Sequence, residues 1–321
     1  MGGQGLAAES LGTIVDDKNG VRDGFNLLPN SYILATEDGK KQFRETLKLH
    51  PGRVGWEIPP SGSVVVHGRQ ISVISYPEIT LRVEANGDWP ERVDSFGPPI
   101  DHLPYTSDLI SWNRSGIERL GDLFPPPVAP VTEVPKGALL IIGGGGSTED
   151  MWEKMIEYAG GKDAFYVCIS QTEESVGAEK LRERGCENIA VHVISNEFGG
   201  LGYGNDVSLL EDLEKADALY FGGGRTFRLM DAYQNTRAHH LMHKLLDKGG
   251  LIVGTSAGAQ IVGDFLVRGD PRTNDNLWME GNDVGLNFLS GVIIDAHFRQ
   301  RGRHNTLPAL LVKHPQMLGI G

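Results

Sequence analysis

From about residue 137 onward, hydrophobic positions follow two alternating patterns. Short, almost continuous apolar runs are typical of strands buried in a parallel sheet, and the stretches between them have the three-to-four-residue apolar spacing of amphipathic helices. The expected strands are residues 138–142, 164–169, 189–194, 217–221, 251–254 and 292–294. The expected helices are residues 149–159, 175–184, 207–215, 227–233, 237–247 and 306–313. This alternation predicts an α/β fold, a three-layer, mainly parallel sheet with helices on both faces.

The first part of the chain has a different pattern. Residues 63–67 and 71–75 flank a turn centred on Gly68, and residues 79–83 follow, which predicts a small antiparallel β-meander at about 61–85. Residues 84–123 predict no element.

A proline-rich segment, residues 124–136, separates the two patterns. Proline lacks the backbone donor and has a fixed φ, so this segment is neither helix nor central strand. We therefore expect a first domain at 1–123, a linker at 124–136 and an α/β part at 137–321.

An internal similarity links the two ends of the chain. Residues 24–35 align with 285–296, and residues 50–55 align with 314–319 after a gap of three residues. The shared order and spacing indicate that residues 1–60 are a divergent copy of the end of the chain. The alternative is coincidence between two apolar strand–helix units.

Charge and cysteine content narrow the function. The 321 residues include 30 Lys and Arg against 42 Asp and Glu, a net charge of −12, which disfavours nucleic acid and anionic membranes as partners. The two cysteines, Cys168 and Cys186, are too few for a disulfide framework or a cysteine-based metal site and are interpreted as structural thiols. The N-terminal residues resemble no signal peptide and no long apolar segment follows, so we expect a cytoplasmic protein.

Glycine is abundant, at 43 of 321 residues, and it gathers at the ends of predicted strands. Examples are residues 143–146, residues 222–224, and Gly254 with Gly258. In parallel α/β sheets, ligands bind at these carboxyl ends.

Gly254-Thr255-Ser256-Ala257-Gly258 has the G-x-S-x-G pattern between a predicted strand and helix. In a sharp strand-to-helix turn of this kind the serine hydroxyl is exposed, and the amide of Ala257 at the helix start can stabilise a developing oxyanion. The alternative is a tight glycine-rich turn without chemistry.

His297 follows the next apolar run, 41 residues after Ser256. A serine nucleophile needs a general base, and neighbouring parallel strands would bring these two residues to the same sheet edge. Arg301 and Arg303 follow the histidine, and guanidinium groups there suit capture of a substrate carboxylate. Asp295 is the nearest candidate for the acid of a catalytic triad. We assign it, together with the two arginines, to substrate binding.

Residues 137–321 resemble the cyanophycinase-like branch of peptidase family S51, relatives of the aspartyl dipeptidases with a class I glutamine amidotransferase-like fold. The motifs that carry the resemblance are Gly143-Gly-Gly-Gly146, Phe221-Gly-Gly-Gly-Arg225, Gly254-Thr-Ser-Ala-Gly-Ala259, Asp295-Ala-His-Phe298 with Arg301 and Arg303, and His314-Pro315 leading to Gly319-Ile-Gly321.

The resemblance implies Ser256 as nucleophile and His297 as its base. It also implies an oxyanion hole of the amides of Gly223, Gly224 and Ala257. Arg301 and Arg303 would hold the aspartyl carboxylates of a peptide or aspartate-containing polymer. The expected activity is a serine-type peptidase that cleaves aspartyl peptide or isopeptide bonds through an acyl-enzyme, with no metal or organic cofactor and, by family analogy, as a homodimer.

Three departures from the family pattern leave alternatives open. In family members, an acidic pair and further strands follow the Gly-Ile-Gly sequence. In this chain the segment that resembles those strands is residues 58–69, in the first part of the chain. Pro59 and Pro60 stand where the acidic pair would be. Residues 55–85 could therefore complete the fold of residues 137–321, or the chain could be a fragment of a longer tandem protein. The first part lacks a serine elbow and a histidine–arginine segment, so we expect no active site there. The rival to an enzyme is a catalytically inactive scaffold or binding protein of the same fold.

Other site classes fit less well. Residues 143–146 lack G-x-G-x-x-G spacing and the acid that dinucleotide binding requires. His239 and His243 have the spacing of zinc ligands on a helix, but the adjacent glutamate and a third ligand are missing, so they are interpreted as part of a solvated helix face. The short interval between Ser256 and His297 also disfavours an ordinary α/β-hydrolase.

Overall fold

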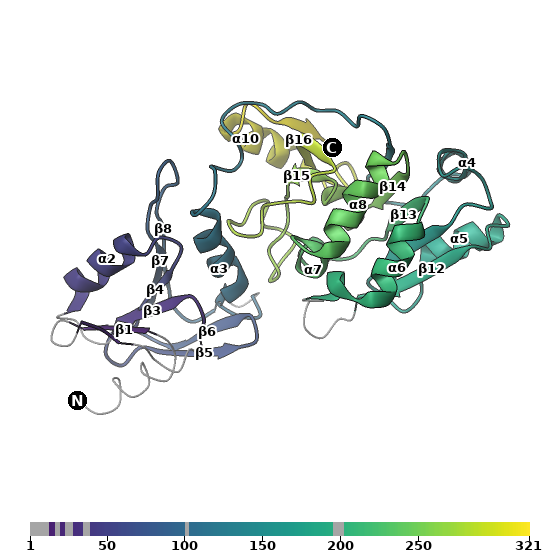
Figure 1. Cartoon of the computed structure of the whole chain (residues 1–321). Helices are drawn as coiled ribbons and strands as arrows, with labels where there is room; N and C mark the ends of the chain where they lie inside the picture. Colours follow the sequence, from purple (N-terminus) through teal and green to yellow (C-terminus); the bar gives the residue numbers. More distant parts are fainter. Residues whose placement is uncertain (1–12, 17–19, 23–27, 35–38, 100–102, 195–201) are drawn as a thin grey trace. The chain divides into compact units, whose positions relative to one another are not determined.

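The computed structural model describes residues 13–16, 20–22, 28–34, 39–99, 103–194 and 202–321. The chain divides into two compact units, Met1–Pro127 and Val128–Gly321, each with its own sheets (Figure 1). The division lies inside the proline-rich segment.

Unit 2 is built on a five-stranded sheet in which every neighbouring pair is parallel. The strand order is β10 (Ala138–Ile142), β14 (Leu251–Thr255), β13 (Ala218–Phe221), β11 (Tyr166–Ser170) and β12 (Ile189–Val193). Five of the six runs expected as parallel strands form this sheet.

Helices cover both faces of this sheet, as alternate residues of β11 show. Tyr166 and Cys168 pack with α4 (Glu149–Tyr158) and α5 (Val176–Glu183). Val167 and Ile169 lie in the opposite core with α6 (Val207–Lys215), α7 (Thr226–Tyr233) and α8 (Arg237–Asp247), and the 3-10 turn η2 (Tyr203–Asn205) precedes α6. The predicted three-layer α/β fold is confirmed.

Polar side chains define where several of these helices begin. The Ser175, Asp206 and Thr236 side chains accept hydrogen bonds from the backbone amides three residues later. Each satisfies an amide that has no partner inside its helix.

A second, three-stranded parallel sheet completes unit 2. It contains β15 (Gly263–Phe265), β16 (Leu289–Ile294) and β17 (Leu318–Ile320), with η3 (Arg303–Asn305) and α10 (Thr306–Lys313) between the last two strands. The expectation that residues 292–294 extend the main sheet is therefore wrong, because β16 pairs with β15 and β17.

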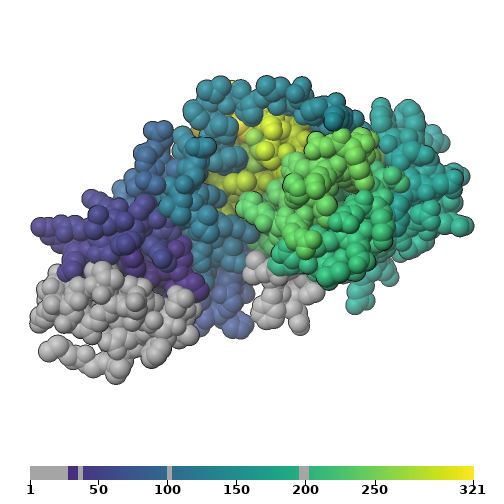
Figure 2. Space-filling model, in the orientation of Figure 1, coloured from purple at the N-terminus to yellow at the C-terminus, as the bar shows by residue number. Residues whose placement is uncertain are grey.

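The segment that leads into unit 2 runs along this second sheet. The Thr132 hydroxyl donates to the carbonyl of Ser290, 2.8 Å away. In Figure 2 the teal atoms of this segment border the yellow surface of the last residues.

Unit 1 contains a six-stranded mixed sheet and a three-stranded antiparallel sheet. The larger sheet has the order β2 (Gly20–Arg22), β1 (Thr13–Asp16), β3 (Ser31–Leu34), β4 (Val54–Glu57), β7 (Ile79–Val83), β8 (Arg92–Phe96). The smaller has the order β5 (Ser63–His67), β6 (Gln70–Ser75), β9 (Ser107–Asp108). The helices are α2 (Lys40–Leu49) and α3 (Leu109–Glu118).

The predicted meander is correct only in its hairpin. β5 and β6 pair antiparallel, but β7 pairs with β4 on one side and β8 on the other, in the larger sheet. Both edges of β7 are therefore occupied within unit 1.

The internal similarity corresponds to two strand–helix–strand segments of the same construction. In β3–α2–β4, Ser31 pairs with Val54 and Tyr32 with Gly55, and in β16–α10–β17, Val292 pairs with Leu318 and Ile293 with Gly319. These are the partners that the alignment equates. The residues that end the two helices, His50 (φ −127°, ψ 65°) and His314 (φ −128°, ψ 66°), share one backbone conformation. The internal repeat itself stays a prediction, and its residues 24–27 and 35 lie outside the described residues.

Candidate active site

Ser256 sits at the sharp turn between β14 and the short helix α9 (Ala257–Gln260). Its φ is +55°, a left-handed conformation that is rare for serine. A Cβ on Gly254 would clash with the carbonyl of Gly258, and a Cβ on Gly258 would clash with the carbonyl of Phe221. The two glycines let the chain turn tightly enough to present the Ser256 side chain at the end of the strand.

The end of β10 brings His297 to this serine. The Ser256 amide donates to the carbonyl of Ile142 (3.0 Å), and the His297 amide donates to the carbonyl of Gly143 (2.7 Å). The Ser256 Oγ and His297 Nε2 atoms are 2.8 Å apart. The two residues therefore meet across β10, from strands of two different sheets.

The surroundings of His297 favour the neutral imidazole. Burial lowers its pKa below the usual 6.5, the charges of Arg301 and Arg303 lower it further, and Asp295 opposes them. A neutral ring near pH 7 can accept a proton from Ser256.

Gly223 lies beside the serine hydroxyl. A Cβ at this position would be 3.3 Å from Cβ and 3.6 Å from Oγ of Ser256, so glycine keeps that space open. Within the part of the chain that the structure describes, the backbone amides of Gly223, Gly224 and Ala257 donate no hydrogen bond. Their place in an oxyanion hole stays a prediction.

Asp295 and Arg303 do not lie where they were expected. Asp295 is 1% exposed and receives two hydrogen bonds from Arg268, from Nε at 2.8 Å and from Nη2 at 3.0 Å. Arg303 is 6% exposed and donates to Asp295 and to the carbonyl of Ala296. A charged side chain is stable in the interior only when paired, and this pairing directs both groups into the fold instead of towards a substrate.

Among the described residues, Asp295 is also not placed as the acid of a catalytic triad. Its carboxylate oxygens bond to the two arginines, and no carboxylate among the described residues is hydrogen-bonded to Nδ1 of His297. Arg268, whose φ is +59°, is a residue that the sequence did not reveal. It holds the segment that carries His297.

Arg301 differs from Arg303 because it is exposed. Its backbone amide donates to the carbonyl of His297 at 3.0 Å, and its charge lowers the pKa of the imidazole. Of the two arginines expected to bind carboxylates, Arg301 has the more accessible guanidinium.

Ser256 and His297 line a cleft of about 640 Å³. Glycines of two loops, 144–146 and 222–224, form part of its wall, together with the aromatic rings of Trp152 and Tyr220. Lys180, Arg228 and Glu174 add charge. Lys180 also pairs with Glu183, whose carboxylate is 2.8 Å from its Nζ atom.

Gln171, at the end of β11, is a cleft residue that sequence reasoning missed. It is 4% exposed, and its side-chain amide bonds to both backbone groups of Arg225. In the sequence Gln171 stands in a polar stretch, residues 170–175, that follows a buried apolar run, so no local signal separates it from its neighbours.

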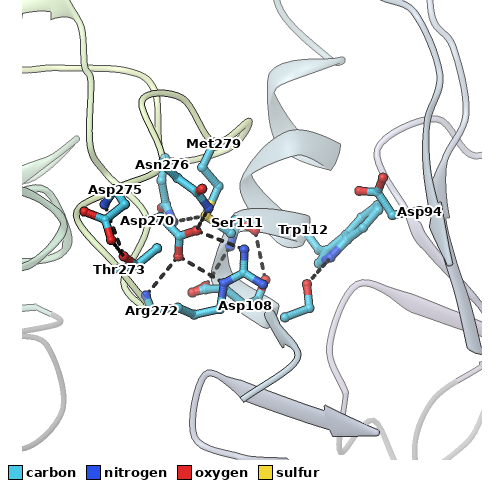
Figure 3. Close-up of polar contacts among 12 residues, drawn as sticks. Asp94, Asp108, Ser111, Trp112, Asp270, Arg272, Thr273, Asp275, Asn276 and Met279 are labelled. Carbon is cyan, nitrogen blue, oxygen red and sulfur yellow. Dashed lines mark hydrogen bonds and ion pairs between the residues drawn. The ribbon is translucent and has the colours of Figure 1, made fainter. Parts of the chain in front are cut away.

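The loop after β15 contains a buried acidic residue. Asp270 accepts hydrogen bonds from Arg272 and from Asn276 (Figure 3). Although burial alone would raise the pKa of Asp270, these bonds hold it below its usual value. The carbonyl of Asp270 accepts from Nη2 of Arg225 at 2.8 Å, which connects this loop to the start of α7.

His239 and His243 do not form a solvated helix face as expected. Each Nε2 is 2.9 Å from the carbonyl of Leu286, and the two Nε2 atoms are 3.2 Å apart. The histidines thus connect α8 to the segment before β16. The described residues contain no group of three His, Cys, Asp or Glu side chains that could hold a metal ion.

Among the described residues, no helix combines the length and apolar character that a membrane crossing requires. Both cysteines are buried, and burial raises the pKa of the Cys168 thiol to about 12. This thiol is not activated as a nucleophile.

Unit 2 is similar in sequence to proteins of peptidase family S51 and to cyanophycinases. The model of peptidase family S51 matches residues 186–321. Cyanophycinase from Geminocystis herdmanii is 26% identical over 197 residues, which is 58% of this chain and 71% of that protein. Cyanophycinase from Synechococcus elongatus is 25% identical over 197 residues, 58% of this chain and 60% of that protein. Cyanophycinase from Trichormus variabilis is 29% identical over 156 residues, 46% of each.

Unit 2 is also similar to two solved structures. A putative peptidase E protein from Listeria monocytogenes has 21% identity and a TM-score of 0.39, covering 58% of this chain and 90% of that one. A peptidase from an acI-B1 Actinobacterium has 17% identity and a TM-score of 0.40, covering 52% of this chain and 71% of that one. Unit 2 is therefore similar to peptidase family S51 over residues 186–321 and to the cyanophycinases.

Proposed function

We propose that unit 2 is a serine-type peptidase that cleaves peptide or isopeptide bonds involving aspartate. The observation that carries this proposal is the 2.8 Å separation of Ser256 Oγ and His297 Nε2 at a glycine-flanked turn. A hydroxyl becomes an effective nucleophile when a neutral base takes its proton, and the lowered pKa of His297 keeps the ring neutral.

The reaction proceeds in two stages. Ser256 Oγ attacks the substrate carbonyl while its proton passes to Nε2 of His297, and amides of Gly223, Gly224 and Ala257 stabilise the oxyanion. His297 then gives the proton to the leaving amine as the C–N bond breaks, which leaves an acyl-enzyme. A water molecule, deprotonated by His297, hydrolyses the ester and restores Ser256.

The aspartyl preference is supported by charge and by the relatives. Arg301 is exposed near the imidazole, and Lys180 and Arg228 line the cleft, so an acidic substrate group would find complementary charge. The relatives that match unit 2 are cyanophycinases. The substrate class includes α-aspartyl peptides, β-aspartyl peptides and a branched aspartate–arginine polymer.

Covalent labelling tests the nucleophile. Purified protein is incubated with a fluorophosphonate, and the adduct is located by peptide mass spectrometry in wild type, Ser256→Ala and His297→Ala. We expect labelling at Ser256 in wild type, none in Ser256→Ala, and a rate at least about 10³ times lower in His297→Ala. Ser290→Ala and His240→Ala are matched controls that should label as wild type does.

The pH dependence of labelling tests the base. Because the pKa of His297 is lowered, the rate should stay constant from pH 8 to below pH 6.5 and fall only at lower pH. The aspartyl preference is then measured with α-aspartyl and β-aspartyl dipeptides against the matching glutamyl and asparaginyl peptides.

The second candidate function is a catalytically inactive binding protein. The missing carboxylate at Nδ1 of His297 among the described residues favours it. A folded wild type that neither labels with fluorophosphonate nor with a smaller sulfonyl fluoride, but binds aspartyl peptides, would establish this alternative.

A further inference from the structure

We propose that Gln171 is a positioning residue that holds the loop of residues 222–225 in place beside Ser256. The inference rests on the proposed function, because this loop carries two of the expected oxyanion donors, the amides of Gly223 and Gly224.

The side-chain amide of Gln171 pairs with a single residue of the loop. Its Oε1 accepts from the Arg225 amide at 2.9 Å, and its Nε2 donates to the Arg225 carbonyl at 3.1 Å. One planar amide therefore satisfies both backbone groups of Arg225, as a neighbouring β-strand would. Arg225 precedes the first residue of α7, so this contact also defines where the helix starts.

The loop is held at both ends, and its middle faces the serine. At the near end the Gly222 amide donates to the Ile169 carbonyl at 2.9 Å. At the far end a Cβ on Gly224, whose φ is +133°, would lie 2.5 Å from Cδ of Gln171. Gly223 lies between these points, next to Ser256. Both anchors, Ile169 and Gln171, come from the end of β11, so that strand determines how far the loop stands from the nucleophile.

The chemistry of the amide group is what the position requires. A carboxylate could accept from the Arg225 amide, but it could not donate to the carbonyl, and its charge would repel a developing oxyanion. A protonated carboxylic acid presents an O–H donor beside a carbonyl acceptor, as the amide presents N–H beside its carbonyl. Burial raises the pKa of a carboxyl group, so Gln171→Glu should change from a poor to an adequate substitute as the pH falls.

The test measures the second-order rate of fluorophosphonate labelling at Ser256 in wild type, Gln171→Glu and Gln171→Ala. Gln234→Glu introduces the same change at a half-buried glutamine that does not line the cleft. At pH 8 we expect Gln171→Glu to react about 10²-fold more slowly than wild type and Gln171→Ala about 10-fold, with Gln234→Glu unchanged. From pH 8 to pH 5.5, the rate of Gln171→Glu relative to wild type should rise at least about 5-fold as the acid protonates. Near-ultraviolet circular dichroism, recorded over the same range, checks that the folded fraction is constant.

The outcomes separate the two proposals. If wild type labels at Ser256 and both Gln171 variants match it, or the relative rate of a folded Gln171→Glu stays flat with pH, the positioning inference is wrong and the proposed function stands. If a folded wild type labels neither with the fluorophosphonate nor with the smaller sulfonyl fluoride, the proposed function is wrong and the inference fails with it. A slow Gln171→Glu that recovers at low pH supports both, because a merely unfolded fraction would not recover on acidification.

Discussion

The segments β3–α2–β4 of unit 1 and β16–α10–β17 of unit 2 share order, register and helix end, but they differ in what surrounds them. In both, a strand glycine packs under the helix. A Cβ on Gly55 would lie 2.5 Å from Leu47, and one on Gly319 would lie 2.6 Å from Leu311. The outer side of β4 pairs with β7, whereas β17 pairs with β16 alone within the described residues.

The two segments also differ where the first strand ends. The alignment places Leu34 of β3 opposite Asp295, the residue that anchors Arg268 and Arg303 and so supports the turn that carries His297. The residues of unit 1 that would match that turn, 35–38, lie outside the described residues. Within the described residues, Asp295 pairs with two arginines, whereas the matching Leu34 is an apolar residue inside β3. One strand–helix–strand scaffold can therefore carry different side chains at the end of its first strand.

The largest expected difference between the segments lies in the second strand. Trp56 of β4 is fully buried, and its indole donates to Ser31 at 3.1 Å, while the matching Ile320 is half-buried. Trp56→Ala should lower the unfolding free energy of unit 1 by about 3–5 kcal/mol, and Ile320→Ala that of unit 2 by about 1–2 kcal/mol. Hydrogen exchange of peptides from each unit measures both, and equal losses would contradict the comparison.

The two strand glycines should differ by less. Gly55 is enclosed by Leu47, Phe43 and Arg82, all within 3.0 Å of an added Cβ, whereas at Gly319 one atom of Leu311 lies that close. Overpacking should cost about 1–3 kcal/mol for Gly55→Ala, and less than about 1 kcal/mol for Gly319→Ala because one flexible leucine can move. Denaturant unfolding followed by unit-resolved hydrogen exchange checks the order, and a larger cost at Gly319 would refute the assignment of neighbours.

The pH dependence of stability in acid should also differ between the two units. Glu57, at the end of β4, is buried, which by itself would raise its pKa, but bonds from Arg82 and Lys40 hold the pKa below 4.5. A lowered folded pKa stabilises the folded state above pH 4.5, and this contribution is lost as the pH falls below that value. The matching position in unit 2 is Gly321.

Glu57→Gln should therefore flatten the acid-side loss of stability of unit 1 and leave unit 2 unchanged. Urea unfolding between pH 3 and pH 6 measures this slope. An unchanged slope in the variant would show that other carboxyl groups carry it.

The smallest effect concerns the helix ends. Burial lowers the pKa of His314, and Lys313 lowers it further. A histidine with a lowered folded pKa contributes fully above its unfolded pKa of about 6.5, and stability is lost as the pH falls through that value, because the unfolded chain binds the proton more readily. We expect a small loss of stability of α10 between pH 7 and pH 5.5, and His314→Asn should remove it.

His50→Asn is the matched control for that change, because it alters the same helix-end conformation in unit 1. Hydrogen exchange of α10 and α2 at the two pH values gives the comparison. A pH effect on α10 that persists in His314→Asn would assign it to another group.

Much of unit 2 could be predicted from local pattern. The residues of β10 and of helices α6, α8 and α10 match their expected ranges, because the spacing of apolar residues along the chain predicts each of these elements. The pairing of Ser256 with His297 was predicted from strand order, although the reason was partly wrong: β16 belongs to another sheet, and β10 provides the connection.

The direction of charged side chains was not predictable in this way. Asp295 and Arg303 are residue types that are typical of a substrate-binding site. In the structure, however, Arg268, which is distant in sequence, pairs with Asp295 in the interior. Gln171 likewise gains its importance from Arg225, 54 residues away. Neither partnership leaves a local pattern.

The sequence by itself determined the periods of burial, the tight turn at Gly254–Ser256–Gly258 and the acidic net charge, because these depend on neighbours along the chain. Only the tertiary structure decided which sheet each strand joins and which arginine stays accessible. It also decided which residue holds the loop beside Ser256. Those outcomes depend on contacts between distant segments, where the cost of burying a charge or an amide without a partner selects a single arrangement.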